Sequence, residues 1–236
     1  MNELSRMERD WRPGNRRHVR GFLCLLTGIV AITGVAVDML ASGSMKEALD
    51  LFVYFTIQSN LFGGVFMVAT GLLVLKGIPV PFWLGRLSDG ATLWLLVTHL
   101  VYHFMLSGVH HPQGVRIIAN IMMHYATPWL MLLVFFLFSE DAPFRVGTLL
   151  LFCSYPALYA CVSVLRGSLD GFFPYWFLKP YGQYPGGNGS YLQVLLTCAG
   201  MFAAFSAIGS LMMLTRHFAC GLIRKAGRAD RMTETT

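Results

Sequence analysis

Six apolar windows, each close to the length of a membrane-spanning helix, restrict what this chain can fold into. They cover 21–42, 51–75, 91–109, 115–139, 146–165 and 191–215. A helix of about 20 residues crosses the hydrocarbon core of a bilayer. Each window is apolar all round, whereas a strand of a membrane barrel alternates apolar and polar positions. The pattern predicts an all-α, polytopic membrane protein: a bundle of six transmembrane helices.

Composition supports lipid as the solvent of most of this chain. Of its 236 residues, 55% are hydrophobic and 13% are charged, against about a quarter charged in a soluble domain. The first window is too long for a signal peptide and further windows follow it, so we expect an uncleaved first helix. The predicted organisation is a basic tail over 1–20, a six-helix transmembrane domain over 21–215 and a basic tail over 216–236.

The basic residues are distributed unevenly between the connections and so predict an orientation. Of the 18 Lys and Arg residues, four lie on one side of the predicted membrane (Lys46, Arg116, Arg166 and Lys179) and the remaining 14 on the other. Cytoplasmic connections carry the excess of Lys and Arg, so both termini are predicted to be cytoplasmic. Topology explains the net charge of +6, and we expect no nucleic-acid partner. In a bacterium the membrane would be the inner (plasma) membrane; the sequence specifies no oligomeric state.

Polar side chains recur one helical turn apart inside four of the windows. They are Thr56, Ser59 and Asn60; His99 and His103; Asn120, His124 and Thr127; and Tyr155 and Tyr159 on either side of Pro156. Polar groups in the hydrocarbon are costly and generally face the protein interior. These stripes are therefore candidate functional positions.

The predicted depths of these residues place them at one level. At 1.5 Å per residue, Thr56 lies about 9 Å, His103 about 8 Å and His124 about 12 Å below the outer helix ends. Asn60, Asn120, His99 and Tyr159 fall in the same half of the bilayer. The agreement predicts one polar chamber that opens outward. A single buried Asn or Thr, however, more often joins two helices by a hydrogen bond than performs chemistry.

Thr56 and His124 are the candidate catalytic pair. A threonine hydroxyl becomes a nucleophile when a neighbouring base removes its proton, and a neutral imidazole suits that role. Asn60, Asn120 or a second histidine could stabilise the oxyanion or orient the base. His99, His103, Tyr155 and Tyr159 complete the predicted supporting or substrate-binding set. At this depth the site would meet a membrane lipid, so the expected substrate is a lipid ester, cleaved without a metal or other cofactor.

Three segments resemble a known family. They are TIQSN (56–60), MMHYATP (122–128) and YPALYACVSVLRGSLDGFFPYWF (155–177). They are similar to the androgen-induced and androgen-dependent TFPI-regulating membrane proteins, six-helix threonine hydrolases that cleave fatty acid esters of hydroxy fatty acids. The resemblance implies that Thr56 is the nucleophile and His124 the base. It covers most of the span from the second window through the fifth and the loop that follows, and it is weak outside the quoted segments. His99 and His103 match no motif of the family.

Two other classes of function also fit the polar residues. Histidines from facing membrane helices are common axial ligands of b-type haem, and His103 and His124 have compatible predicted depths. A zinc or copper site is a related alternative, with His110 and His111 at the membrane surface as its entry point. Alternatively, a non-enzymatic channel, transporter or interaction protein could use the chamber to bind a ligand without transforming it.

Overall fold

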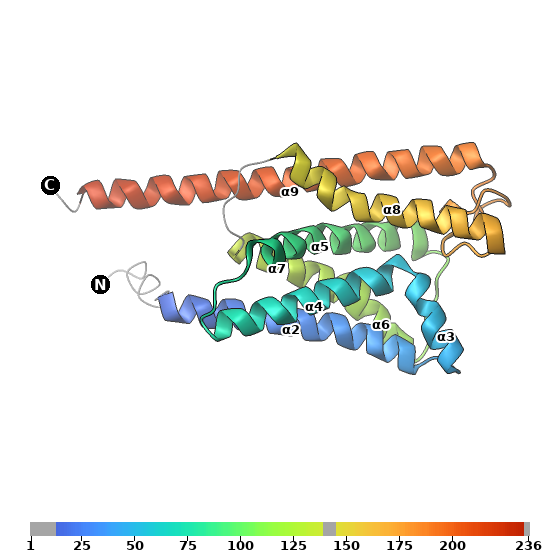
Figure 1. Ribbon diagram of the computed structural model, residues 1–236, viewed down its shortest axis with the longest axis horizontal. Coiled ribbons are helices and arrows are strands. Elements are labelled where there is room, and N and C mark those ends of the chain that lie inside the picture. Colours follow the sequence, from blue (N-terminus) through green and yellow to red (C-terminus); the bar gives the residue numbers. More distant parts are fainter. Residues whose placement is uncertain (1–12, 139–144, 234–236) are drawn as a thin grey trace. The chain divides into compact units, whose positions relative to one another are not determined.

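The described part of the chain, residues 13–138 and 145–233 of a computed structural model, contains helices and no strands. The elements are α2 (Pro13–Leu40), α3 (Met45–Asp50), η1 (Leu51–Val53), α4 (Phe55–Leu75), α5 (Phe82–Val101), η2 (Tyr102–Leu106), α6 (Arg116–Ile121), η3 (Met122–Ala126), α7 (Thr127–Phe138), α8 (Val146–Asp170), η4 (Trp176–Leu178) and α9 (Tyr191–Thr233). Figure 1 shows the long helices. The short elements η2 and η3 are single π-helical turns, whereas η1 and η4 are 3₁₀ turns.

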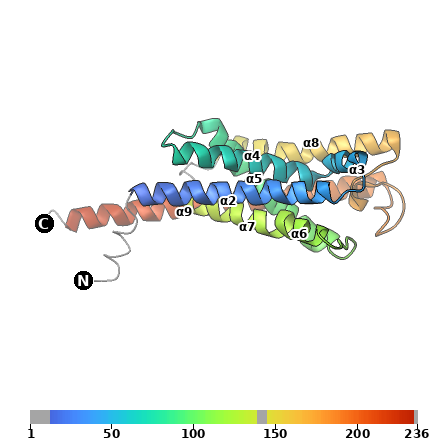
Figure 2. The same ribbon diagram turned by 90° about the horizontal axis from the view of Figure 1, so that it is seen from below.

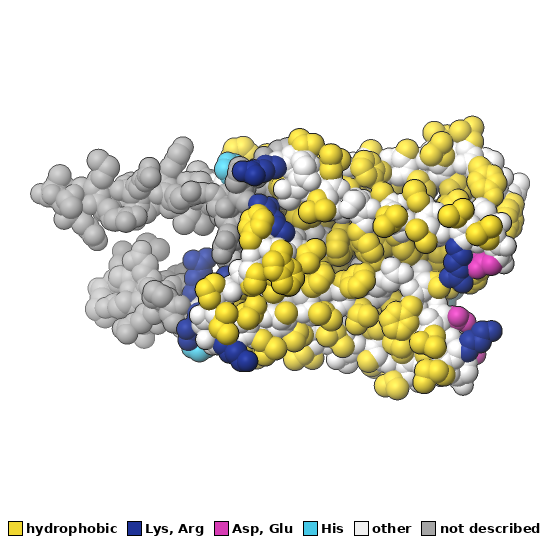
Figure 3. Space-filling model, viewed as in Figure 1, with side chains coloured by type: hydrophobic (Ala, Val, Ile, Leu, Met, Phe, Trp, Pro, Cys, Tyr) yellow, Lys and Arg dark blue, Asp and Glu magenta, His cyan; other side chains and the backbone are white. Residues whose placement is uncertain are grey.

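Five helical segments are long and apolar enough to cross a membrane. They are Asn15–Leu40, Phe55–Leu75, Arg116–Phe138, Val146–Asp170 and Tyr191–Phe218. In the face shown in Figure 3, hydrophobic side chains cover the length of the helices and charged side chains lie toward their ends. The predicted all-α class is thereby confirmed, together with apolar helices compatible with an integral membrane protein.

Helix α5 lies where the third apolar window was predicted, but it is more polar than the five segments above. It begins at Phe82 rather than Ala91, and its first turns include Arg86 and Asp89. Its buried residues include Ser88, Thr92, Thr98 and His99. A helix that turns polar side chains toward protein neighbours needs less apolar character than one surrounded by lipid, which explains its composition.

The chain forms two compact units, Met1–Phe138 and Ser139–Thr236. Helix α2 begins at Pro13, inside the predicted N-terminal tail, and α9 continues to Thr233, through most of the predicted C-terminal tail. In the second unit, the connection between α8 and α9 is a loop with packed aromatic rings, in which Tyr175 stacks on Phe177 with ring centroids 5.1 Å apart. The Asn188 side chain donates hydrogen bonds to the Phe177 carbonyl and Thr197 Oγ1.

Glycines bring α2 and α4 of the first unit into close contact (Figure 2). A Cβ added at Gly28 would lie 2.7 Å from the Gly64 carbonyl oxygen, and one at Gly71 would lie 2.9 Å from the Gly21 carbonyl oxygen. Small residues permit this approach and so allow two membrane helices to associate through backbone packing.

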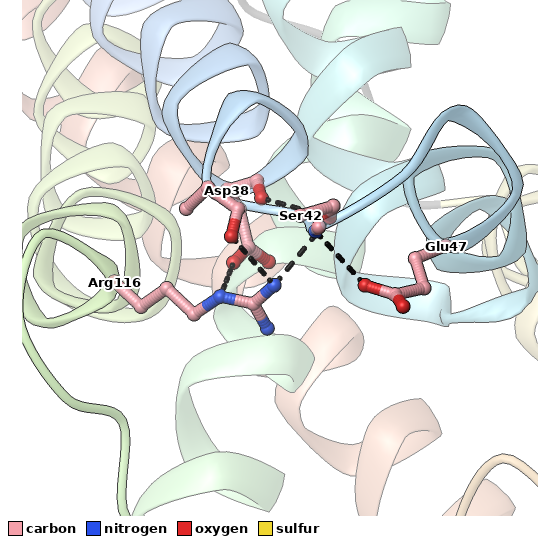
Figure 4. A network of polar contacts seen from close by, with 6 residues as sticks. Asp38, Ser42, Glu47 and Arg116 are labelled. Atoms are coloured by element: carbon pink, nitrogen blue, oxygen red, sulfur yellow. Dashed lines mark hydrogen bonds and ion pairs between the residues drawn. The ribbon is translucent and has the colours of Figure 1, made fainter.

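Polar contacts tie the helix ends of the first unit. Arg16 donates to the Leu137 carbonyl at 3.3 Å, which joins the start of α2 to the end of α7. At the opposite end of α2, Arg116 forms an ion pair with Asp38 at 3.8 Å and donates to Ser42 Oγ at 3.4 Å, as Figure 4 shows. Asp38 therefore has Arg116 as an ion-pair partner across the α2–α6 contact.

Candidate functional site

The first unit brings the predicted nucleophile and base into contact. Thr56 Oγ1 lies 3.2 Å from His124 Nε2, and the contact is buried. Thr56 is the second residue of α4, and His124 lies in the middle of the η3 π turn, 68 positions along the chain. The two residues retain 8% and 7% of their accessible surface.

The other ring nitrogen of His124 determines the direction of this hydrogen bond. His124 Nδ1 lies 3.2 Å from the backbone carbonyl oxygen of Asn120. Because a carbonyl oxygen only accepts, Nδ1 carries the proton and Nε2 has the free lone pair. The Thr56 hydroxyl therefore donates to Nε2, which is the arrangement required of a hydroxyl and its general base.

The π turn and Pro128 together leave two backbone carbonyls without α-helical donors. The Thr127 N–H bonds to the Met122 carbonyl, five residues back, so it is not available to the Met123 carbonyl. Pro128 has no N–H to offer the His124 carbonyl four residues before it. Two successive carbonyls beside the candidate base therefore require donors from elsewhere.

Asn60 and His99 supply those donors from the neighbouring helices. Asn60 Nδ2 donates to the Met123 carbonyl at 3.2 Å and to the Thr56 carbonyl at 2.9 Å. His99 Nδ1 donates to the His124 carbonyl at 2.8 Å. Asn60 thereby uses both N–H groups of its amide, which leaves it no donor for an oxyanion. These two predicted site residues hold the π turn in place.

Tyr102 and Asn120 surround the His124 imidazole on the side of α5 and α6. The Tyr102 ring stacks on the His124 ring, with centroids 3.9 Å apart and planes 25° apart. Asn120 Nδ2 donates to the Tyr102 hydroxyl at 2.8 Å. Asn120 therefore contacts the base through its backbone carbonyl and contacts the stacked tyrosine through its side chain.

His103 lies at the edge of this cluster. Its side chain is exposed, its Nδ1 lies 3.3 Å from the Tyr125 hydroxyl, and its ring stacks on His99 with centroids 6.0 Å apart. It belongs to the second π turn, η2, in which the Ser107 N–H bonds to the Tyr102 carbonyl. Ser107 Oγ donates to the His103 carbonyl at 2.7 Å, another case of a side chain serving a carbonyl that a π turn exposes.

The first turn of α4 adds backbone donors beside Thr56. The N–H of Gln58 is bonded to the carbonyl of Tyr54, the residue that precedes the helix, and the Tyr54 side chain makes no capping bond. The N–H groups of the first helical turn have no intrahelical acceptor, and in α4 this turn includes Thr56 and Ile57. They carry the positive end of the helix dipole.

Other polar residues of these helices join one helix to another. Ser59 Oγ lies 3.1 Å from Thr98 Oγ1, which links α4 to α5 beside the site. Further along the same two helices, Thr70 Oγ1 lies 3.5 Å from Ser88 Oγ. Thr127 is fully buried, and its hydroxyl has no hydrogen-bond partner in the described part of the chain. Ser59 thus joins two helices by a hydrogen bond, as expected for an isolated buried polar residue.

Tyr155 and Tyr159 belong to α8 of the second unit and are half-buried. The Tyr159 ring lies near that of Tyr175 in the aromatic loop, with centroids 6.3 Å apart. Their predicted support of the Thr56 site stays a prediction.

The described residues contain no group of three or more His, Cys, Asp or Glu side chains that could hold a metal ion. Haem ligation through His124 would require its Nε2 to leave the Thr56 hydroxyl, because its other nitrogen is bonded to Asn120. His124 therefore fits the base of a hydroxyl nucleophile better than an axial ligand.

Comparisons with protein-family models, curated proteins and solved structures find no match to this chain.

Two features of the site had not been predicted. Tyr102 stacks on His124, and this contact depends on the packing of α5 against η3. The π turn carried one sequence signal, Pro128, which removes the N–H that would otherwise serve the His124 carbonyl.

Proposed function

We propose that this protein is an intramembrane ester hydrolase with Thr56 as nucleophile and His124 as general base. The observation that carries the proposal is the buried contact of 3.2 Å between Thr56 Oγ1 and His124 Nε2, with His124 Nδ1 directed at the Asn120 carbonyl. Threonine has an unactivated hydroxyl at neutral pH, so a base in contact with it is the first requirement of such chemistry.

The reaction follows the usual two steps of acyl transfer. The Thr56 hydroxyl proton passes to His124 Nε2 as Oγ1 attacks the ester carbonyl carbon, and the C–O bond of the leaving alcohol then breaks as that alcohol takes the proton. Water attacks the resulting acyl-threonine, again losing a proton to Nε2. The proton then returns to Thr56 Oγ1 as the carboxylic acid departs.

The oxyanion of each tetrahedral intermediate needs donors, and the first turn of α4 offers them. The backbone N–H groups of Thr56 and Ile57 lie at the positive end of the helix, next to the nucleophile. Asn60 is excluded from this role because both of its N–H groups are used. Nearby, Asn120 has one N–H beyond the one that it gives to Tyr102.

A lipid ester is the proposed substrate because the pair lies among helices apolar enough to be surrounded by acyl chains. The resemblance noted above narrows this class to fatty acid esters of hydroxy fatty acids. We further propose that α5 is a sixth transmembrane helix, that both termini are cytoplasmic and that the Thr56 pair lies in the outer half of the membrane. The position of Thr56 at the start of α4 and of His99 near the end of α5 supports one level for the site.

The test compares four purified proteins in detergent: wild type, Thr56→Ala, His124→Gln and Thr70→Ala. Turnover of a fatty acid ester of a hydroxy fatty acid and covalent labelling by a fluorophosphonate are measured for each. Thr56→Ala and His124→Gln are expected to lower turnover at least about a hundredfold, and Thr56→Ala is expected to abolish labelling.

Thr70→Ala is the matched control, because it removes a buried hydroxyl from the same helix that contacts Ser88 and not a base. It is expected to retain wild-type turnover. Equal turnover in wild type and Thr56→Ala, or persistent labelling of Thr56→Ala, would locate the nucleophile elsewhere.

A further inference from the structure

We infer that Tyr102 is a positioning residue, which holds the His124 imidazole in the orientation and tautomer that present Nε2 to the Thr56 hydroxyl. The inference rests on the proposed function for its catalytic consequence, but its structural part concerns the histidine ring alone. Tyr102 contacts the base through its ring, and among the described residues no hydrogen bond joins it to the reacting Thr56 oxygen.

The ring of Tyr102 restricts rotation of the imidazole. The two rings stack with centroids 3.9 Å apart and planes 25° apart, and Tyr102 is 5% exposed. Rotation of the His124 ring about its bond to Cβ would turn its edge into the tyrosine face. The hydrogen bond from Nδ1 to Asn120, at 3.2 Å, is long for a bond that must define the ring by itself.

Asn120 closes a ring of contacts around the base. Its backbone carbonyl accepts from His124 Nδ1, and its side-chain Nδ2 donates to the Tyr102 hydroxyl at 2.8 Å. The stacked tyrosine and the Nδ1 acceptor are thus both fixed to the same residue. A movement of Tyr102 would therefore affect the carbonyl that selects the tautomer as well as the surface on which the imidazole lies.

The backbone of Tyr102 is also held. Its N–H bonds to carbonyls of the preceding turn of α5, at Thr98 and His99, and its carbonyl accepts from the Ser107 N–H at 2.8 Å to close the η2 π turn. His99 in turn donates to the His124 carbonyl. Two contacts from one end of α5 therefore reach the same histidine, one to its backbone and one to its ring.

The hydroxyl distinguishes this role from the filling of space. A phenylalanine would fill the same volume and stack on the same ring, but it would lose the link to Asn120. Tyr102→Phe and Tyr102→Leu therefore separate the two components, because the first removes the hydroxyl and the second also removes the ring. Tyr125→Phe is the matched control, since the Tyr125 hydroxyl contacts His103 and not His124.

The experiment measures the tautomer of His124 and the kinetics of ester turnover in the full-length protein. The ring nitrogens are observed by ¹⁵N NMR of histidine-labelled protein in detergent, with His124→Gln to assign the signals. Wild type and Tyr125→Phe are expected to show a single His124 tautomer protonated at Nδ1. Tyr102→Leu is expected to show a mixture of tautomers and a kcat lower by about tenfold to a hundredfold at little changed KM. Tyr102→Phe is expected to lose about threefold in kcat.

The inference is overturned if Tyr102→Leu keeps the single tautomer and the wild-type kcat, or if Tyr125→Phe alters both as much as Tyr102→Leu does. Where Tyr102→Leu fails to fold, Tyr102→Phe decides through kcat: a loss of about threefold supports the inference, and an unchanged kcat overturns it. If the wild type turns over no ester but Tyr102→Leu still changes the tautomer of His124, Tyr102 is retained as the residue that orients His124 and the hydrolase is rejected. Turnover that requires Thr56 but is indifferent to Tyr102 would reject Tyr102 alone.

Discussion

At the scale of single residues, the site depends on how unpaired backbone groups are satisfied. Pro128 and the π turn expose the Met123 and His124 carbonyls, and Asn60 and His99 cover them. A buried carbonyl without a donor costs free energy comparable to a lost hydrogen bond, and more where water is excluded. Two of the residues first considered for chemistry thus maintain the local backbone shape that carries the base.

Removal of the His99 imidazole should destabilise the protein through the His124 carbonyl. We expect His99→Ala to lower the free energy of unfolding in detergent by about 1 to 2 kcal/mol. Pro128→Ala restores an N–H that can reach the same carbonyl, so the two substitutions should be coupled. A double-mutant cycle measured by denaturation should show that His99→Ala costs about 1 kcal/mol less in the Pro128→Ala background. Additive effects would mean that the two donors do not replace one another.

At the scale of helices, glycine placement determines how closely α2 and α4 approach. The sequence shows Gly21 and Gly28 seven residues apart in one window and Gly64 and Gly71 seven apart in the next. In the structure these pairs face each other across the helix contact. A Cβ added at Gly28 or Gly71 would therefore meet backbone atoms of the other helix. Thr56 lies in the first turn of α4, and its height relative to η3 therefore depends on this packing.

Two alanine substitutions with opposite expected signs test the glycine interface. Gly28→Ala would place a Cβ 2.7 Å from the Gly64 carbonyl oxygen, so we expect it to lower the stability in detergent by about 1 to 3 kcal/mol. Gly85→Ala in α5 meets nothing within 4 Å, so its better helix propensity should raise stability by up to about 1 kcal/mol. Thermal unfolding of both variants gives the comparison, and a neutral Gly28→Ala would show that the helices can separate without cost.

At the scale of the whole molecule, the proposed orientation in the membrane rests on the distribution of Lys and Arg. The proposed topology places the α6 end of the first unit, with Arg116 and Asp38, outside the cell or in the lumen, and the loop between α4 and α5 in the cytoplasm. The helices of the first unit support alternating directions, since Arg16 at the start of α2 contacts Leu137 near the end of α7.

Cysteine labelling of intact cells or vesicles tests that orientation. In a cysteine-free background, a membrane-impermeant maleimide should label Gln113→Cys from outside, because this residue is exposed in the connection before α6. It should label Ile78→Cys, which is exposed in the connection after α4, only after permeabilisation. The reverse pattern would invert the topology and move the Thr56 pair to the cytoplasmic half of the membrane.

The sequence by itself determined the helical class and the apolar helices. It also singled out Thr56, Asn60, His99, Asn120 and His124, which contact one another in the structure. Those features follow from hydropathy and from the 3.6-residue period, which act along a single segment. The more polar α5 and its start at Phe82 were less accurately predicted, because burial against protein relaxes the need for apolar residues.

Only the tertiary structure decided which polar residue does what. Asn60 could have served as an oxyanion donor until its N–H groups were found bonded to two carbonyls, and Tyr102 had no distinct role until its ring was found on His124. Such assignments depend on contacts of a few ångströms between helices far apart in the chain, and these contacts follow from helix packing and from the π turn rather than from any local pattern.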